Sequence, residues 1–469
     1  MSSESKASNI QTQPAVTPPL DPAFVPAYLF RHTYRKRLEN SGNAPEKLLI
    51  AVERENGLVC RGDLTVFPED AGCKQETLTL AERHVKFMVW AFGGWKVHLS
   101  GPGFVCNHIR DVYAASGARA FDNDLMSGVY GQPFTVNITD AANIPEPRER
   151  SSELGGHMSG CRIGFDLGAS DYKIAAVRDG EPVFSTEIPW DPVPQTDPEY
   201  HYSRVNDALK TAASHLPRVD AIGGSAAGIY IDNEVKVASL FRSVPKDLFA
   251  STVKPMFRRL QREWNVPLVV VNDGDVTALA GALSLETTGI LGIAMGSSEA
   301  VGYLNRDGRI PGYLNELAFA PVDYGADAAV DEWSGDRGVG ARYFSQQAVN
   351  RLAPAAGFEF PREMPLPERL KEVQKAMGNG HDSAADIFRT IGVYLGYSLA
   401  HYADYYPIQS ALILGRVTSG RGGEIIISTA DEVLQKEFPE LARKISVHVP
   451  DEKSRRVGQS VAAASLPAI

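Results

Sequence analysis

The feature that most constrains the fold is a series of short apolar runs between residues 161 and 415, each followed by a loop of small or acidic residues. The runs with their loops are CRIGFDLGAS, VDAIGGSAAG, VPLVVVNDGD, TGILGIAMGSS and SALILGRVTSG. Their composition is that of buried β-strands. Helical patterns such as VKPMFRRLQREWN lie between them. The alternation of strands and crossovers predicts an α/β fold of two lobes that face a cleft.

The chain is long enough for several domains. Its 469 residues, 43% of them hydrophobic, correspond to about three units of roughly 150 residues each. Two stretches rich in Pro, Ser and Gly or Thr interrupt the apolar patterns, and they predict a tail and a linker. We expect a flexible tail at 1–24, a small α/β domain of unknown role at 25–143, a linker at 144–160, a first lobe at 161–284 and a second lobe at 285–469.

The small domain at 25–143 is predicted from its local patterns. Two β-rich runs flank Glu55-Asn56-Gly57, and Asn-Gly between such runs favours a hairpin. An amphipathic helix, TLAERHVKFMVWAF, follows, and then a strand from Trp95 to Leu99. A helix over 107–115 and a strand in QPFTVNITDA complete the prediction.

Composition excludes several classes of protein. A net charge of −10 and a pI near 5.6 argue against a nucleic-acid binder, which needs a basic surface. None of the four cysteines forms a Cys-x-x-Cys pair, so a disulfide scaffold and a thiolate zinc site are not expected. The amino terminus lacks the pattern of a signal peptide, and no apolar run reaches the roughly 20 residues of a membrane span. We expect a cytoplasmic protein.

The loop from Asp166 to Ser170 is a candidate phosphate site. A turn containing Gly168, Ala169 and Ser170 lets backbone N–H groups approach a polyphosphate closely. Asp166 at its edge could hold a water of a magnesium shell, because magnesium prefers oxygen ligands. An ordinary β-hairpin turn is the alternative interpretation.

The segment Asn272-Asp273-Gly274-Asp275 is a candidate catalytic site. It follows the apolar strand VPLVVV and opens a helical pattern. A carboxylate at the carboxyl end of such a strand is well placed as a general base for phosphoryl transfer. Helix capping is the alternative, because Asp and Asn are favoured at N-caps.

Two further loops contain small residues in a suggestive order. Gly296 and Ser297 could form a second phosphate clamp, and the glycine-rich turn that begins at Gly415 would allow an adenine or ribose to approach. Arg416 and Arg421 could contact phosphates. A flexible surface loop explains each pattern equally well.

Taken together, these loops resemble the ROK family of sugar kinases, within the actin/hexokinase/Hsp70 superfamily. The resemblance covers about residues 161 to 466. DLGASDYKIAAV is similar to the first phosphate motif, VVVNDGDVTALAGAL to the segment with the catalytic aspartate, and GIAMGSSEAVGYLNRDGRIPGYLNELAFAPVD to the second phosphate motif and the segment after it. SALILGRVTSGRGG is similar to the adenosine motif, and RVGQSVAAASL to the closing helix.

The resemblance implies a two-lobed actin-like ATPase (ribonuclease H-like) fold and ATP-dependent phosphorylation of a sugar or sugar-like hydroxyl. Asp273 would be the general base, and Asn272, Glu316 and Gly228 would bind the sugar. The ATP phosphates would meet Asp166, which holds Mg²⁺, with Gly168, Ala169, Ser170, Lys173, Gly296, Ser297 and Gly415. The expected partners are ATP, Mg²⁺ and a small sugar, without nucleic acid or membrane. A homodimer would be in keeping with the family.

The chain also departs from the family pattern. Phe319 stands where the family has a zinc-binding histidine, and every cysteine of the zinc loop is replaced within 332–341. Phenylalanine and valine cannot ligate zinc, so a zinc ion of the family type is not expected and apolar packing would hold this loop. Ala341 replaces a sugar-contacting glutamate, and Glu299 stands where glycine is expected beside the phosphates. A non-catalytic sugar- or nucleotide-binding regulatory protein on the same scaffold is therefore the alternative function.

The first 150 residues lie outside the resemblance. ROK repressors carry a helix-turn-helix there, whereas this segment is predicted to contain strands. Its basic cluster RHTYRKR at 31–37 is interpreted as a solvated helix end, with a nucleic-acid contact as the alternative. The aromatic group WAFGGW at 90–95 is interpreted as a core cluster, with a ligand platform as the alternative.

Overall fold

The computed structural model describes residues 10–149, 154–449 and 452–469, which form two compact units. The first unit takes its described residues from 10–149, 294–301 and 313–449, and the second from 154–293, 302–312 and 452–469. The small domain expected at 25–143 is thus packed together with the segment 313–449. The compact units consequently differ from the boundaries predicted from the sequence.

The second unit contains a mixed sheet of five strands in the order β12-β9-β6-β7-β8. Its strands are β6 (Cys161–Leu167), β7 (Asp171–Arg178), β8 (Glu181–Pro189), β9 (Ala221–Ala226) and β12 (Leu268–Asn272). β6, β9 and β12 are parallel, whereas β7 and β8 continue the sheet as an antiparallel meander. Every residue of the central strand β6 is buried, as its continuous apolar run predicts.

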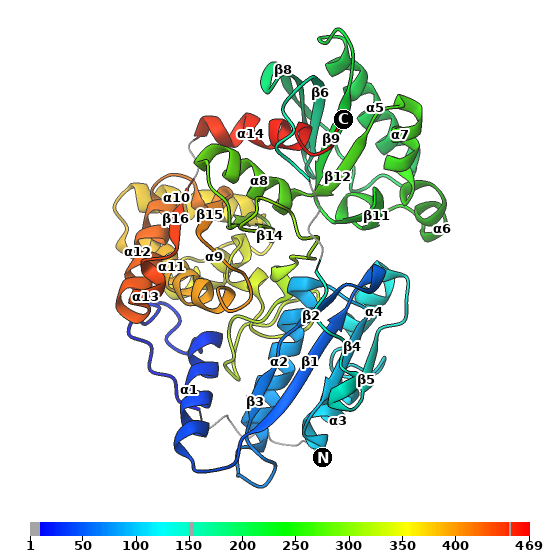
Figure 1. Ribbon diagram of the computed structural model, residues 1–469. Coiled ribbons are helices and arrows are strands. Elements are labelled where there is room, and N and C mark those ends of the chain that lie inside the picture. Colours follow the sequence, from blue (N-terminus) through cyan, green and yellow to red (C-terminus); the bar gives the residue numbers. More distant parts are fainter. Residues whose placement is uncertain (1–9, 150–153, 450–451) are drawn as a thin grey trace. The chain divides into compact units, whose positions relative to one another are not determined.

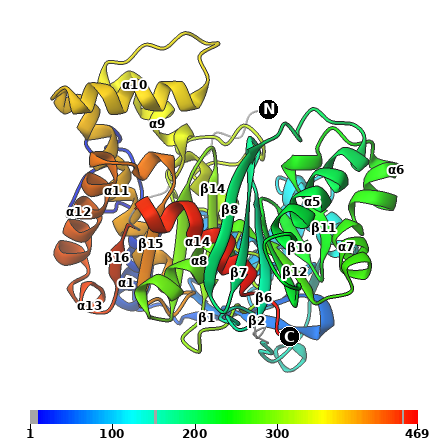
Figure 2. The ribbon, with the colours of Figure 1, turned by 90° about the horizontal axis from the view of Figure 1, so that it is seen from above.

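Helices cover both faces of this sheet (Figure 2). On one face α14 (Glu452–Ala464) lies directly on the strands, where Gly164 and Gly223 have no side chain. A Cβ atom on either glycine would come within 1.7 Å of a carbonyl oxygen of α14. The other face packs against α5 (Pro198–Ala213) and α7 (Met256–Trp264) through residues such as Phe165 and Phe257. The glycines therefore set how closely α14 approaches.

Three further elements complete the second unit. β10 (Ile229–Ile231) and β11 (Glu234–Val237) form an antiparallel pair next to β12, and α6 (Lys246–Leu248) follows them. Helix α8 (Asp273–Leu285) begins immediately after β12. The helix predicted from VKPMFRRLQREWN is α7, and the strand predicted from VPLVVV is β12, so both predictions are confirmed.

The amino-terminal part of the first unit is a second sheet with flanking helices (Figure 1). Its order is β2-β1-β4-β5, and β3 pairs with β1. The strands are β1 (Glu46–Glu53), β2 (Val59–Arg61), β3 (Leu64–Val66), β4 (Lys96–Ser100) and β5 (Thr135–Ile138), and the helices are α2 (Lys74–Phe92), α3 (Gly103–Val112) and α4 (Ala120–Tyr130). The hairpin predicted at Asn56 is confirmed, because β1 and β2 are antiparallel and Asn56 has a φ of 59°.

A third sheet, in the order β14-β13-β15-β16, is formed by later segments. Its strands are β13 (Ile290–Met295), β14 (Glu299–Leu304), β15 (Ser410–Leu414) and β16 (Ser446–His448). The helices of this part are α9 (Gln346–Leu352), α10 (Leu366–Gly378), α11 (Asp382–Tyr402), α12 (Arg421–Glu437) and α13 (Pro439–Ala442). The long helix α11 packs against α12 and is buried along most of its length.

The segment before α1 (Ala27–Asn40) differs from the expected flexible tail over residues 10–24. The Ala15 N–H donates a hydrogen bond of 2.7 Å to the Glu437 carboxylate, and Asp21 forms an ion pair of 2.9 Å with Arg351. Phe24 is buried among tyrosine rings. These few polar and aromatic anchors hold a segment whose composition alone predicts disorder. Residues 1–9 lie outside the described part of the chain. No helix among the described residues is long and apolar enough to cross a membrane.

Candidate functional site

Asp166 lies at the carboxyl end of β6, on the sheet face that carries Gly164. The neighbouring parallel strand places Ser225 beside it, and the Ser225 hydroxyl donates a hydrogen bond of 2.6 Å to Asp166 Oδ1. Lys173, opposite Asp166 on β7, has its Nζ atom 3.7 Å from Oδ2. Sheet register alone therefore brings together a carboxylate, a hydroxyl and an ammonium group.

Asp273 is the first residue of α8, at the carboxyl end of β12. Asn272 is the N-cap, and its Oδ1 atom accepts a 2.7 Å hydrogen bond from the Gly274 N–H. Gly302 on β14 allows this turn to lie directly against the strand, because a Cβ at Gly302 would come within 2.0 Å of the Gly274 carbonyl oxygen. Capping, the alternative interpretation of this motif, is thus observed at Asn272, while Asp273 stays half-buried at the helix start.

The two carboxyl groups influence each other electrostatically. Burial, reinforced by the negative charge of Asp166, raises the pKa of Asp273 to about 6, although the Gly274 N–H opposes this change. Burial likewise raises the pKa of Asp166, and the Ser225 hydroxyl and Lys173 counteract it only in part. The positive charge near the two carboxyl groups is thus too small to offset the effect of burial on their pKa values. A bound cation would stabilise both ionised carboxylates.

The first candidate phosphate loop is a tight turn between β6 and β7. The Gly168 N–H donates to the Asp171 carbonyl oxygen, and the Trp190 indole N–H donates to the Gly168 carbonyl oxygen at 2.8 Å. Ala169 and Ser170 are exposed, and the Ser170 hydroxyl donates to the Asp171 carboxylate. The β-hairpin alternative therefore describes the backbone correctly, and the exposed tip remains open to a ligand.

Gly228 lies in the loop after β9 and has a φ of 127°, which favours glycine. A Cβ there would come within 2.5 Å of the Val237 carbonyl oxygen on β11. The Asn272 Nδ2 atom donates a 2.7 Å hydrogen bond to the Gly228 carbonyl oxygen. Gly228 and Asn272 thus lie together, and their contact fixes the loop next to the start of α8.

The residues predicted to bind phosphate and adenosine in the first unit also lie together. Gly296 and Ser297 form the turn between β13 and β14, closed by a 3.0 Å hydrogen bond from the Gly296 N–H to the Ser298 carbonyl oxygen. Gly415, at the end of β15, is packed against Met295, because a Cβ there would come within 2.5 Å of the Met295 carbonyl oxygen. The backbones of the adjoining strands β13 and β15 therefore pack so closely at this point that glycine is required at position 415.

Glu316 and Glu299 form a pair of neighbouring carboxyl groups in the first unit. Glu299 has 4% of its surface exposed, and neither of its carboxylate oxygens has a hydrogen-bond partner among the described residues. Burial, and secondarily the charge of Glu316, raises the pKa of Glu299 to about 8. One oxygen lies against Gly340, where a Cβ would approach it to 2.0 Å. Glu299 is therefore mostly protonated at neutral pH, which removes the repulsion expected from its charge.

Aromatic rings and charged side chains surround the loop at 332–341. Phe319 packs against Trp90 and Trp333 with ring centroids 4.5 and 5.2 Å apart, and Asp336 pairs with Arg83 and Arg119. The expectation of apolar packing therefore covers only part of the arrangement. In the described part of the chain, no three His, Cys, Asp or Glu side chains are grouped as metal ligands.

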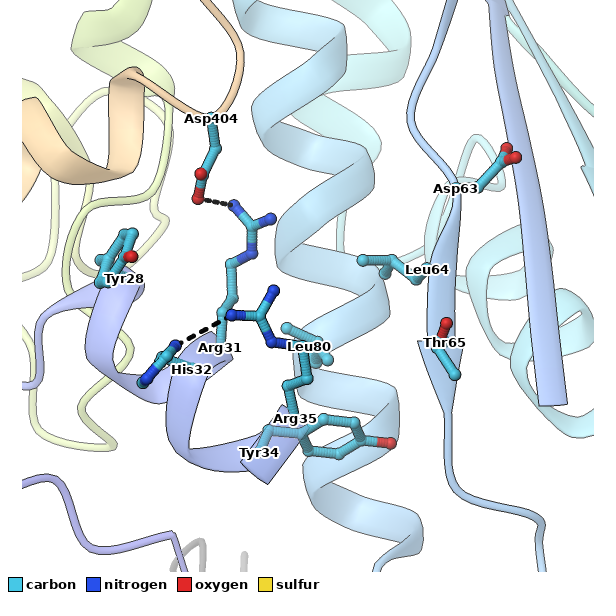
Figure 3. A pocket seen from close by; sticks show the side chains of 10 residues that line it. All are labelled: Tyr28, Arg31, His32, Tyr34, Arg35, Asp63, Leu64, Thr65, Leu80 and Asp404. Carbon is cyan, nitrogen blue, oxygen red and sulfur yellow. Dashed lines mark hydrogen bonds and ion pairs between the residues drawn. The ribbon is translucent and has the colours of Figure 1, made fainter. Parts of the chain in front are cut away.

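A pocket of about 230 Å³ in the first unit is lined by Arg31, His32 and Arg35, which belong to the basic cluster of α1 (Figure 3). Arg31 is directed toward Asp404 and forms an ion pair of 3.2 Å with it, and His32 lies 3.1 Å from Arg35. Arg31 also donates to the Tyr405 hydroxyl. Because Arg31 is held by an acidic partner, this pocket lacks the uniformly basic surface of a nucleic-acid site.

Sequence reasoning missed two side chains of the site. Ser225 contacts Asp166 from strand β9, whose parallel register with β6 could have identified it. Burial, and secondarily the charge of the nearby Asp273, raises the pKa of the Tyr230 hydroxyl. The register of β9 with β6 is the signal for Ser225, whereas no pattern in the sequence places Tyr230 near Asp273.

The described sheets and helices define a class of fold: α/β, with the five-stranded order of the ribonuclease H-like sheet in the second unit. No family model matches this sequence, and no curated protein does. Among solved structures, a ROK family transcriptional regulator described as a homologue of the E. coli MLC protein is 16% identical, with a TM-score of 0.52, over 66% of this chain and 78% of that chain. A ROK hexokinase from Thermus thermophilus is 15% identical, with a TM-score of 0.51, over 65% of this chain and 96% of that chain. About two thirds of the chain therefore shares the fold of these two ROK proteins, which confirms the predicted fold class.

Proposed function

We propose that this protein transfers the terminal phosphoryl group of ATP to a hydroxyl group of a sugar or sugar-like substrate. The observation that carries the proposal is Asp273, a half-buried carboxylate at the start of α8 whose pKa is raised to about 6. A carboxylate with this pKa is ionised at neutral pH and still basic enough to accept a hydroxyl proton. The ROK hexokinase, which has the same fold, supports this assignment.

The other site residues support the transfer in distinct ways. Asp166, with Ser225 and Lys173, fits Mg²⁺, since its site has too little positive charge for two carboxylates. Bound Mg²⁺ with ATP would supply charge neutralisation for the phosphates. At the exposed tips of the turns at 168–170 and 296–297, the backbone N–H groups of Ala169 and Ser297 and the Ser297 hydroxyl can face an anion. Asn272 and Glu316 would orient the sugar.

A second candidate function is a non-catalytic sugar- or nucleotide-binding regulator. It is favoured by Ala341, which stands where the resemblance to the ROK family places a sugar-contacting glutamate. The ROK transcriptional regulator with the same fold shows that this scaffold is not restricted to kinases. In that case the protein would bind its ligand without consuming ATP.

One pair of measurements distinguishes these functions. Thermal-shift titration with magnesium-ATP detects nucleotide binding, because a ligand that binds the native state raises its stability. A panel of sugars with ATP consumption as the readout then detects transfer. Binding with turnover that Asp273→Asn abolishes supports the kinase. Sugar binding without ATP consumption for any substrate supports the regulator.

A further inference from the structure

The carboxyl end of α2 is joined to the segment that carries Glu316. The last carbonyl oxygens of α2 accept hydrogen bonds from successive N–H groups of that segment: Glu316 to Trp90 at 3.0 Å and Asn315 to Ala91 at 2.9 Å. These carbonyls have no partner within a helix. Asn315 is itself buried, with a φ of 54° and a 3.2 Å hydrogen bond from the Tyr406 hydroxyl. The path of the backbone at Glu316 is therefore set by α2.

A second connection is aromatic. Phe319 lies between Trp90 of α2 and Trp333, and Phe121 of α4 is within 5.6 Å of Phe319 and 5.8 Å of Trp333, centroid to centroid. Trp90 is fully buried, whereas Trp333 is 65% exposed. The rings of α2 and α4 thus form the surface on which residues 319 and 333 rest.

The third connection is a buried ion cluster centred on Asp336. One carboxylate oxygen of Asp336 lies 2.9 Å from Arg83 and 3.3 Å from Lys86, and the other lies 2.6 Å from Arg119. Lys86 also contacts both oxygens of Asp122 at 2.8 Å. Burial opposes ionisation of Asp336, yet these three cations hold its pKa well below its usual range.

Backbone contacts connect the loop around Asp336 to the segment that carries Glu316. Val330 and Arg337 are bridged, so residues 330–337 form a closed turn. The Val322 N–H donates to the Gly338 carbonyl oxygen at 2.8 Å, and Pro321 is bridged to Val339. Displacement of Asp336 would therefore loosen residues 316–323 as well.

We propose that α2 and α4 form an internal support for the loop 313–338, and that Asp336 is a positioning residue for Glu316 through its contacts with Arg83, Lys86 and Arg119. The amino-terminal segment then has a role in sugar recognition although it does not itself touch the sugar. This inference rests on the proposed function for the role of Glu316, but the support itself is independent of catalysis.

The test uses the full-length protein and Arg83→Gln, which removes one cation from Asp336 without altering the proposed site. Amide hydrogen exchange is measured over 313–338, with β6 and β9 of the second unit as the internal reference. We expect exchange over 313–338 to rise about tenfold or more, the size expected for a lost charge-assisted hydrogen bond, with little change in the reference strands. Arg83→Lys should restore most of the protection, and Arg110→Gln, at an exposed position of α3, should behave as wild type.

Steady-state kinetics of the same variants test whether this support affects Glu316. If the protein is a sugar kinase, Arg83→Gln should raise the KM for the sugar more than it lowers kcat. Absence of turnover in the wild type would refute the proposed function and leave the exchange result valid. Unchanged exchange over 313–338, or an equal rise in both units, would overturn the support. Should Arg83→Gln not fold, Trp333→Ala removes an exposed ring from the same cluster and must raise exchange in the same segment.

Discussion

Asp273 and Asp166 lie at the ends of β12 and β6, near enough for the charge of Asp166 to add to the raised pKa of Asp273. Strand β9 separates the two strands in the sheet, so their carboxyl ends project from the same edge. In the proposed function, this arrangement would combine a base with a second carboxylate that can bind a cation, as phosphoryl transfer requires. It also makes the protonation of Asp273 sensitive to what Asp166 binds.

The first prediction concerns turnover against pH. Because the base must be ionised, kcat/KM should rise with pH through about 6 and then level off. Ser225→Ala removes a hydrogen bond to the Asp166 carboxylate, which should raise the pKa of Asp166. With Asp166 then more often protonated, less negative charge faces Asp273, and the rise should move to lower pH. Initial rates from pH 5 to 8 measure both profiles, and a profile that is flat below pH 6 would exclude Asp273 as the base.

The second prediction concerns Asp273→Asn. We expect kcat to fall by about 10² to 10⁴, the usual contribution of a general base, with nearly unchanged magnesium-ATP binding. Asp191→Asn, an exposed aspartate outside the site, is the matched control. Steady-state kinetics and nucleotide titration provide the readouts. Wild-type turnover in this variant would show that another group is the base.

The third prediction uses Glu299. Its folded pKa, about 8, is raised above the unfolded value, so its contribution to stability falls as pH rises from about 4.5 to 8. Glu299→Gln removes this titration, so the free energy of unfolding of the variant relative to wild type should increase across that range. Urea unfolding at several pH values measures the trend, and Glu359→Gln at an exposed site serves as the control. A constant difference would show that Glu299 is not buried in solution.

The fourth prediction concerns the seating of α14. Gly164→Ala places a Cβ 1.7 Å from the Ser460 carbonyl oxygen, which forces α14 away from β6. We expect a loss of about 1–3 kcal/mol or more, the usual cost of overpacking. Gly458→Ala, within α14 but without a neighbour inside 4 Å, should be neutral or slightly stabilising. Equal thermal midpoints for the two variants would show that α14 does not rest on the sheet.

The sequence predicts those features whose cause is local. Asn56 in a turn, the apolar strand before Asn272 and the helix that starts at Asp273 each depend on residues within one or two turns of chain. Features that depend on distant residues could not be read in this way. Asp336 meets Lys86 only after folding, and Gly164 is explained only by α14, nearly three hundred residues later.

The ionisation of Glu299 also depends on residues that are distant in the sequence. The sequence shows an acidic residue where the resemblance places glycine beside the phosphates, and this supports the non-catalytic alternative. Burial against Gly340 changes its protonation, and no pattern of neighbouring residues predicts that burial. Local chemistry can thus identify an unusual residue, while its ionisation depends on the packed environment.

The bond between Ala15 and Glu437 joins residues 422 positions apart, and this has a consequence for biosynthesis. At about 5–20 residues per second, the ribosome needs roughly 20–80 s to reach Glu437 after it has made Ala15. During that interval the apolar surfaces of α1 and α2 have emerged without the later segments that cover them. The contact between Ala15 and Glu437 can therefore form only late in translation or after it.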